Sequence, residues 1–186
     1  MRKCTLFFLY LHLTTNYHIV KNIYIILFIM AVGVLGVACQ AKVPKGKLIY
    51  CSYARTGAAG LGKNYCELIA DPGTDPIVRV VLNADNRFDE PEVREEYPAT
   101  AEDVASLQEM LASNKVYKLN GYNLEEPITG GYSYRIYMEY DSDDRVEARW
   151  YGHKVKDQAI DAYNYIEYFF KPWRDRAVQE NNTTNP

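Results

Sequence analysis

A glycine-rich segment that ends in lysine is the most suggestive chemical motif in this chain of 186 residues. The run Gly57-Ala-Ala-Gly-Leu-Gly-Lys63 fits the G-x-x-x-x-G-K pattern of P-loops, whose backbone N–H groups cradle phosphates. Asn64 follows where a P-loop carries the Ser or Thr that holds magnesium, and a short β-favouring run comes next instead of a long helix. We therefore predict a hairpin turn at this segment and no nucleotide.

An acidic cluster gives a weak indication of calcium binding. Asp141, Asp143 and Asp144 resemble the start of a calcium loop, but Val146 and Gly152 stand where an EF-hand needs Gly and Glu. A solvated turn is the interpretation that we favour, and we predict no metal and no cofactor.

Support for nucleophilic or zinc chemistry is equally thin. His153 is the only histidine after the N-terminal forty residues, and no Cys-x-x-Cys pair occurs. Two carboxylates could still meet in the fold and support hydrolysis by general acid and base. We expect a protein that is not an enzyme, with an envelope hydrolase that uses paired carboxylates as the alternative.

The N-terminal segment is predicted to direct export. No charge lies between Lys21 and Lys42, and residues 23–38 read IYIILFIMAVGVLGVA. An apolar run behind a basic residue and before small residues is typical of a secretory signal. An uncleaved signal anchor and a buried core helix are the alternatives.

Cys39 is the candidate site of lipid attachment. The small residues before it resemble a bacterial lipobox, whose Cys is diacylated and becomes the mature N-terminus; Gly36 stands here in place of the usual leucine, and Leu35 lies one place earlier. Two acyl chains, such as palmitate, hold a protein stably on a membrane. The expected organisation is a signal sequence at 1–38 (with 1–20 reflecting a start assigned too early), a lipidated tether at 39–47, one domain at 48–178 and a disordered tail at 179–186.

The exported part is acidic. No Asp or Glu precedes Glu67, whereas the whole chain carries a formal net charge of −3. Nucleic-acid binding needs a positive surface that replaces the counterions of phosphates, so we exclude it.

Cys51 and Cys66 are candidates for a disulfide. They lie on two predicted neighbouring strands, at positions roughly symmetric about Ala58-Ala59. An exported protein meets an oxidising compartment, where a bridge that closes a loop of this size contributes about 3 kcal/mol. Two buried free thiols are the alternative.

Apolar periodicity predicts the elements that position these residues. Alternation or β-favouring composition predicts strands at 48–54, 64–70, 77–82, 132–140 and 145–151. Helical spacing predicts a first helix from a capping box at Thr100–Asp103 to Asn114. A last helix is predicted from Asp157, stopped or bent at Pro172, with a buried stripe of Ile160, Tyr163, Ile166 and Phe170. The segment 83–98 is polar and reads as a loop.

The order βββ-α-ββ-α predicts an α+β domain with an antiparallel sheet of about five strands and two helices packed on one face. In the last hairpin, pairing the apolar faces suggests Met138 opposite Ala148 and Ile136 opposite Trp150. The outer face then presents a candidate contact surface, because Tyr and Arg are enriched at binding hot spots; an ordinary solvated sheet face is the alternative. The residues of this surface are Arg135, Tyr137, Arg149 and Tyr151.

The layout of residues 48–171 resembles small lipoproteins of Bacteroides-type bacteria that are described mainly as domains of unknown function. The resemblance rests on a Tyr-rich first hairpin ending near Gly57, a helix closed by Asn114-Lys-Val-Tyr117, a hairpin opened by Gly131-Tyr132 and a closing aromatic helix. It implies a cell-envelope location and brings no catalytic residue. We expect a non-catalytic, membrane-anchored lipoprotein that binds a protein or glycan partner; a structural subunit of a surface assembly is a further alternative.

Overall fold

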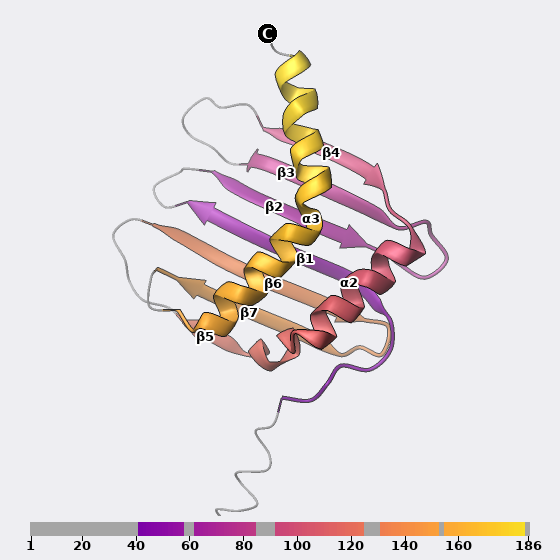
Figure 1. Cartoon of the computed structure of the whole chain (residues 1–186), viewed down its shortest axis with the longest axis vertical. Coiled ribbons are helices and arrows are strands. Elements are labelled where there is room, and N and C mark those ends of the chain that lie inside the picture. The colour runs from indigo at the N-terminus through magenta and orange to yellow at the C-terminus, as the bar shows by residue number, and fades with distance from the viewer. Residues whose placement is uncertain (1–40, 58–61, 85–91, 125–130, 153–154, 185–186) are drawn as a thin grey trace, which may run out of the picture. The chain divides into compact units, whose positions relative to one another are not determined.

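The computed structural model describes residues 41–57, 62–84, 92–124, 131–152 and 155–184, so the predicted signal at 1–38, Cys39 and His153 lie outside the described residues. Within these ranges the chain forms seven strands, two α-helices and one short 3-10 helix, which confirms the α+β class (Figure 1). In chain order they are β1 (Leu48–Gly57), β2 (Lys63–Ile69), β3 (Ile77–Ala84), β4 (Val93–Pro98), α2 (Ala101–Ser113), η2 (Val116–Leu119), β5 (Tyr122–Leu124), β6 (Tyr132–Tyr140), β7 (Arg145–Tyr151) and α3 (Asp157–Thr184).

The strands form one mixed sheet in the order β4-β3-β2-β1-β6-β7-β5, in which only β5 and β7 run parallel. The prediction of about five antiparallel strands is therefore right in part. It missed the edge strand β4, whose sequence VREEYP looks like a polar loop although Val93 and Tyr97 are 6% and 5% exposed. It also missed β5, which is only three residues long.

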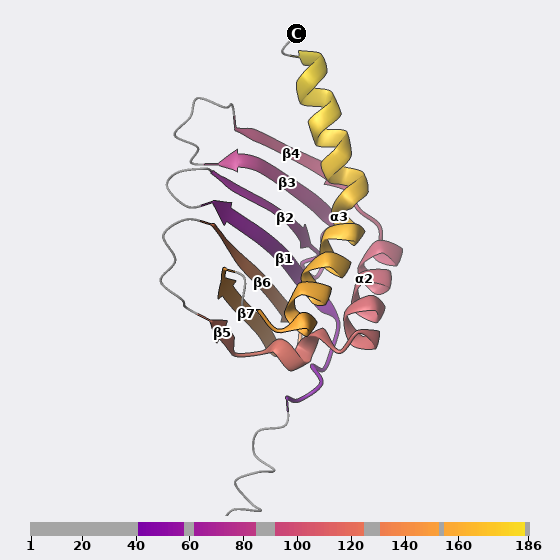
Figure 2. The ribbon, with the colours of Figure 1, turned by 60° about the vertical axis from the view of Figure 1, so that its left-hand side comes forward.

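Both α-helices cover the same face of the sheet, as predicted (Figure 2). Their buried side chains join those of the strands in one core, which includes Leu107, Ile166 and Phe170. None of the helices in the described part of the chain is long and apolar enough to cross a membrane.

The predicted capping box starts α2. The Asp103 amide donates to Thr100 Oγ1 at 3.1 Å, and the Thr100 amide donates to Asp103 Oδ2 at 2.8 Å. These bonds satisfy backbone donors that the first helical turn leaves free. Asn114 caps the other end of the helix, which confirms the predicted boundary.

The last helix departs from the sequence prediction in three ways. It continues through Pro172 to Thr184, so residues 179–184 are helical and not a disordered tail. Burial of Ala177 and a 2.8 Å hydrogen bond from the Tyr97 hydroxyl to Glu180 bind this extension to the sheet. Ile160 is 43% exposed, because the buried stripe begins one position earlier, at Ala159.

The predicted tether is bound to the domain from residue 42 onward. The amides of Lys45 and Lys47 each donate at 2.8 Å, to Asp144 Oδ2 and Asp141 Oδ1, and Lys42 Nζ lies 3.2 Å from Asp144 Oδ1. Gly46 adopts φ +82°, and a Cβ there would lie 2.0 Å from Asp141 Oδ1. The acidic turn that suggested calcium therefore holds the chain that leads into β1.

Candidate functional site

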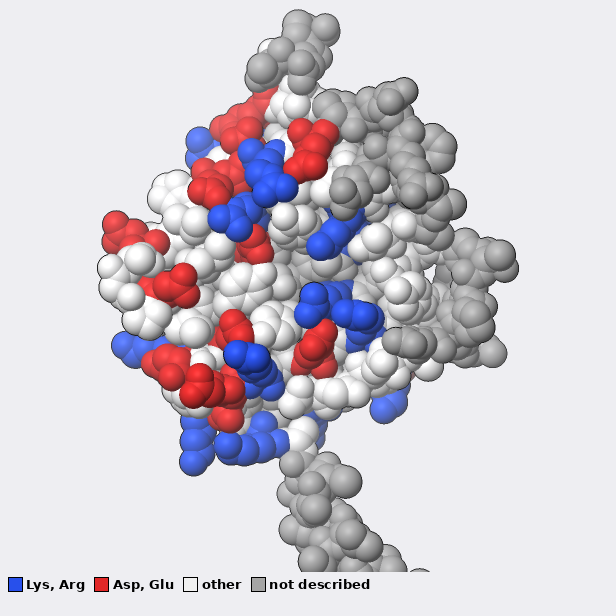
Figure 3. Space-filling model, turned by 180° about the vertical axis from the view of Figure 1, so that it is seen from behind, with Lys and Arg blue, Asp and Glu red and all other residues white. Residues whose placement is uncertain are grey.

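The helices leave one face of the sheet open (Figure 3). On that face the central strand β1 presents Tyr50 and then three small side chains, Ser52, Ala54 and Thr56, opposite larger ones such as Tyr65 and Arg135. The difference in size leaves a trough along the middle of the sheet, with a cavity volume of about 460 Å³. We call this cavity the trough; its floor is those three residues.

Larger side chains line the two sides of the trough. The strand register places Ala54 between Tyr65 of β2 and Arg135 of β6. Lys63 lies beside Thr56, and β7 adds Arg149 and Tyr151 on the far side. One side therefore offers a tyrosine and a lysine, and the other offers two guanidinium groups and a second tyrosine.

Positive charge dominates this part of an otherwise acidic chain. Arg135 and Arg149 share one carboxylate, that of Glu147, at N···O distances of 2.9 and 3.7 Å. Lys63 has no acidic partner among the described residues, and its Nζ lies 4.6 Å from the centre of the Tyr65 ring. Three cations line the trough, and the one described acid that lines it, Glu67, is paired with Arg79, so the trough is suited to a ligand that carries negative charge.

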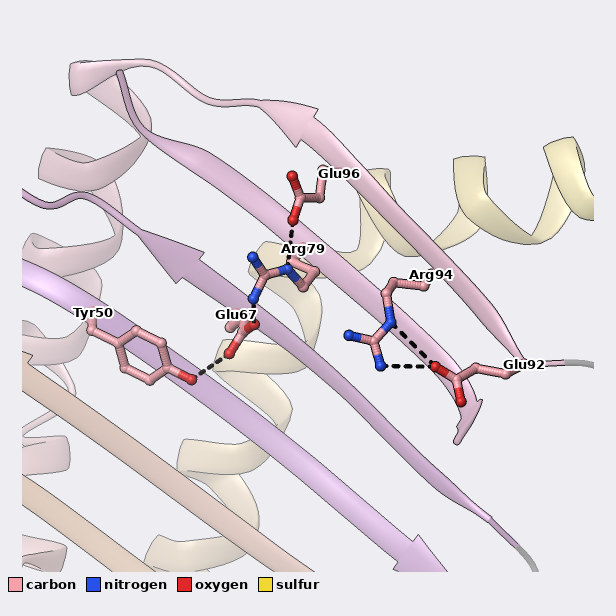
Figure 4. Close-up of polar contacts among 6 residues, drawn as sticks. All are labelled: Tyr50, Glu67, Arg79, Glu92, Arg94 and Glu96. Atoms are coloured by element: carbon pink, nitrogen blue, oxygen red, sulfur yellow. Dashed lines mark hydrogen bonds and ion pairs between the residues drawn. The ribbon is translucent and has the colours of Figure 1, made fainter. Parts of the chain in front are cut away.

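The other end of the trough is held by a chain of polar contacts (Figure 4). The Tyr50 hydroxyl donates to Glu67 Oε2, and Arg79 donates to Glu67 Oε1 at 2.6 Å and to Glu96 Oε1 at 2.7 Å. Burial, followed by the hydrogen bond to Glu67, raises the pKa of the Tyr50 phenol, so it remains a neutral donor. The Tyr50 ring also meets the Tyr137 ring edge-on, with centroids 5.8 Å apart.

The four residues of the predicted contact surface all lie on the open face. Arg135, Arg149 and Tyr151 line the trough, while Tyr137 packs beside Tyr50. Whether they contact a partner stays a prediction. Sequence reasoning missed the floor of the trough and the β2 side, although the alternation of small residues at 52, 54 and 56 was a usable signal.

The predicted register of the β6–β7 hairpin is wrong by two residues. The structure pairs Ile136 with Ala148 and Met138 with Val146. A shift of two residues leaves every side chain on the same face, so the prediction of an outward-facing surface survived the error.

Of the two alternatives for Cys51 and Cys66, a disulfide or two buried thiols, the structure has the second: both are free and buried. Cys66 lies opposite Tyr53, and Cys51 lies opposite Leu68, so the two thiols are diagonal neighbours. Diagonal positions in antiparallel strands are about 7–8 Å apart, beyond the usual Cα separation of a disulfide. Cys66 Sγ instead lies 3.5 Å from the Tyr53 hydroxyl.

The nucleotide-binding interpretation of the glycine-rich segment fails on the structure that flanks it. Residues 58–61 are outside the described part, but Lys63 begins a strand that pairs antiparallel with β1, where a P-loop would begin a helix. No group of three or more His, Cys, Asp or Glu side chains is placed to hold a metal ion within the described residues.

Searches of protein-family models and of curated proteins find nothing that matches this chain.

Proposed function

We propose that the protein is a non-catalytic envelope lipoprotein, anchored at Cys39, whose trough binds a glycan that carries negative charge. The observation that carries the proposal is the row of Tyr65, Ala54 and Arg135, where an aromatic ring and a guanidinium group stand on either side of a small floor residue. A sugar ring can lie against a tyrosine, and an acidic substituent can accept from arginine.

Two features favour a glycan over a protein partner. The polar floor and rim, with Ser52, Thr56 and Ser133, match the hydroxyl groups of a sugar chain. Protein interfaces usually contain an apolar anchor at their centre. Among the described residues of the open face, Tyr151 is the only large hydrophobic residue that is clearly exposed, at 39%.

The point at which the tether enters the domain also leaves the cationic end of the trough accessible to a ligand. The tether joins β1 at Leu48, and the cationic end of the trough lies near Thr56 and Lys63 at the other end of that strand. Eight residues of extended chain span roughly 26 Å. The tether therefore enters the domain at the end of β1 that is farther from these cations.

Hydrolysis by paired carboxylates gains no support from the acids near the trough. Glu67 and Glu96 both pair with Arg79, so neither is a free carboxylate that faces the trough alone. A hydrolase needs one carboxylic acid and one free carboxylate that face the same glycosidic bond.

The test is affinity electrophoresis of the full chain in detergent micelles, in gels that contain either polygalacturonate or neutral dextran. We expect polygalacturonate to slow migration, less so at high salt, and dextran to have no effect. Replacing Arg135 and Arg149 together with alanine should weaken retardation at least tenfold, since a hydrogen bond to a charged group contributes about 1.5–3 kcal/mol.

The matched control is the double variant Lys171→Ala/Arg176→Ala, which also removes two positive charges, but from α3. Equal retardation of the Arg135→Ala/Arg149→Ala variant and wild type, or retardation by dextran, would contradict the proposal. Shortening of the polymer would favour the hydrolase. The anchor is tested separately by palmitate labelling: label that persists in Cys39→Ser would refute lipidation at this residue.

A further inference from the structure

A second cavity lies on the helix-covered face of the sheet, between the first half of α3 and the ends of β1, β6 and β7. Its volume is about 370 Å³. Three aromatic rings form much of its wall: Tyr134 stacks on Trp150 with centroids 5.7 Å apart, and Tyr163 meets Tyr134 edge-on at 5.0 Å. The trough lies on the other face of the sheet, and Tyr134 is the one described residue that lines both cavities.

Arg55 supplies the only cationic side chain of this cavity wall among the described residues. Its guanidinium carbon lies 3.9 Å from the centre of the Tyr132 ring, which fixes its position. Its Nε is buried and has no hydrogen-bond partner, and no described residue forms an ion pair with it. A guanidinium group has five N–H donors, and leaving one buried and unsatisfied costs free energy.

The neighbouring acid does not neutralise Arg55. Glu167 lines the same cavity, but its Oε1 accepts from Arg174 Nη1 at 2.5 Å. Burial raises the pKa of the Tyr163 phenol, so this side chain stays neutral as well. The cavity therefore combines an unpaired cation with aromatic walls.

We infer that this cavity binds a small organic carboxylate with a flat apolar body, whose carboxylate accepts from Arg55 and whose ring packs among Tyr134, Trp150 and Tyr163. Arginine is the side chain best suited to a carboxylate, because its donors form a planar fork. A mostly aromatic pocket with one directing charge is typical of sites for small molecules.

The test uses the full chain labelled with 5-fluorotryptophan, in detergent micelles, observed by fluorine NMR and titrated with benzoate. The chain has two tryptophans, of which Trp150 lines the cavity and Trp173 packs against Phe169. We expect a saturable shift of the Trp150 resonance, with Trp173 as the internal reference. Benzyl alcohol, which has the same ring without the charge, should bind at least tenfold more weakly.

Arg55→Met should lose the benzoate response by at least tenfold, whereas Arg94→Met, which removes an exposed charge from the edge strand β4 and lines neither cavity, should leave it unchanged. Measurements on the wild-type protein are enough to overturn the inference: it fails if benzoate gives no saturable shift, or if benzyl alcohol gives an equal response. An undiminished response in a folded Arg55→Met variant would overturn it too. The polygalacturonate test and the benzoate test use different ligands and different variants. A failure of one proposal can therefore be told from a failure of the other.

Discussion

Glu67 is the acid whose removal should most affect stability. Only 8% of the residue is exposed, and its two carboxylate oxygens accept from two different donors, Tyr50 and Arg79. Glutamine at this position has one acceptor oxygen, so one donor would face an NH₂ group and lose its partner. We expect Glu67→Gln to lower the free energy of unfolding by about 2 kcal/mol, within the usual 1–3 kcal/mol for an unsatisfied buried group.

The measurement is equilibrium unfolding in urea, followed by the fluorescence of Trp150 and Trp173, both of which pack in the domain. A change of 2 kcal/mol corresponds to roughly 4–8 °C in melting temperature for a domain of this size. The matched control is Glu92→Gln. Glu92 pairs with Arg94 at 2.9 Å, but both side chains are well exposed, so this variant should unfold like wild type. If Glu67→Gln also unfolds like wild type, Glu67 is not the polar link that the contacts indicate.

Three further predictions test other parts of the structure. Without reductant, Cys51 and Cys66 should not react with a thiol reagent in the folded protein, because both are buried and burial raises the pKa of each thiol, that of Cys66 to about 11. Both should react once the protein is unfolded. A disulfide between them would leave them unreactive in the folded and in the unfolded state. Thr100→Ala should lower the free energy of unfolding by about 1 kcal/mol in urea, since it removes the capping box of α2, and no change would show that the box is unimportant. Asp144→Asn should speed hydrogen exchange at the Lys45 amide, which donates to Asp144. That hydrogen bond lowers the pKa of Asp144. In wild type, the protection of the Lys45 amide from exchange should therefore persist above the ordinary Asp pKa of about 3.9 and be lost as the pH falls below it. Equal exchange rates in the variant and wild type at neutral pH would show that Asp144 does not hold the tether.

The sequence predicted the elements whose side chains repeat with a strong period. The alternation in β6 and β7 and the capping box of α2 are local signals, and both were identified correctly. The register of the β6–β7 hairpin was missed because an alternating pattern is unchanged by a shift of two residues. The turn decides between such registers, and Asp143 adopts φ +65° there, which the pattern of apolar residues does not encode.

Elements that depend on distant contacts were harder to predict. The edge strand β4 has few apolar residues, so its identity depends on pairing with β3. The helical end of α3 depends on Tyr97 and on burial of Ala177 against the sheet. The small residues at 52, 54 and 56 could have indicated the floor of the trough, but its sides depend on the strand pairing that brings Tyr65, Ala54 and Arg135 together.

The shape of the trough is tested most directly by filling its floor without changing any charge. Ala54→Ile places a larger side chain between Tyr65 and Arg135, and isoleucine is well suited to a strand. The measurement is calorimetric titration of the full chain in micelles with a galacturonate oligosaccharide, for wild type and variant. We predict that the dissociation constant of the folded variant rises at least tenfold. A value within twofold of wild type would show that the trough is not the binding site.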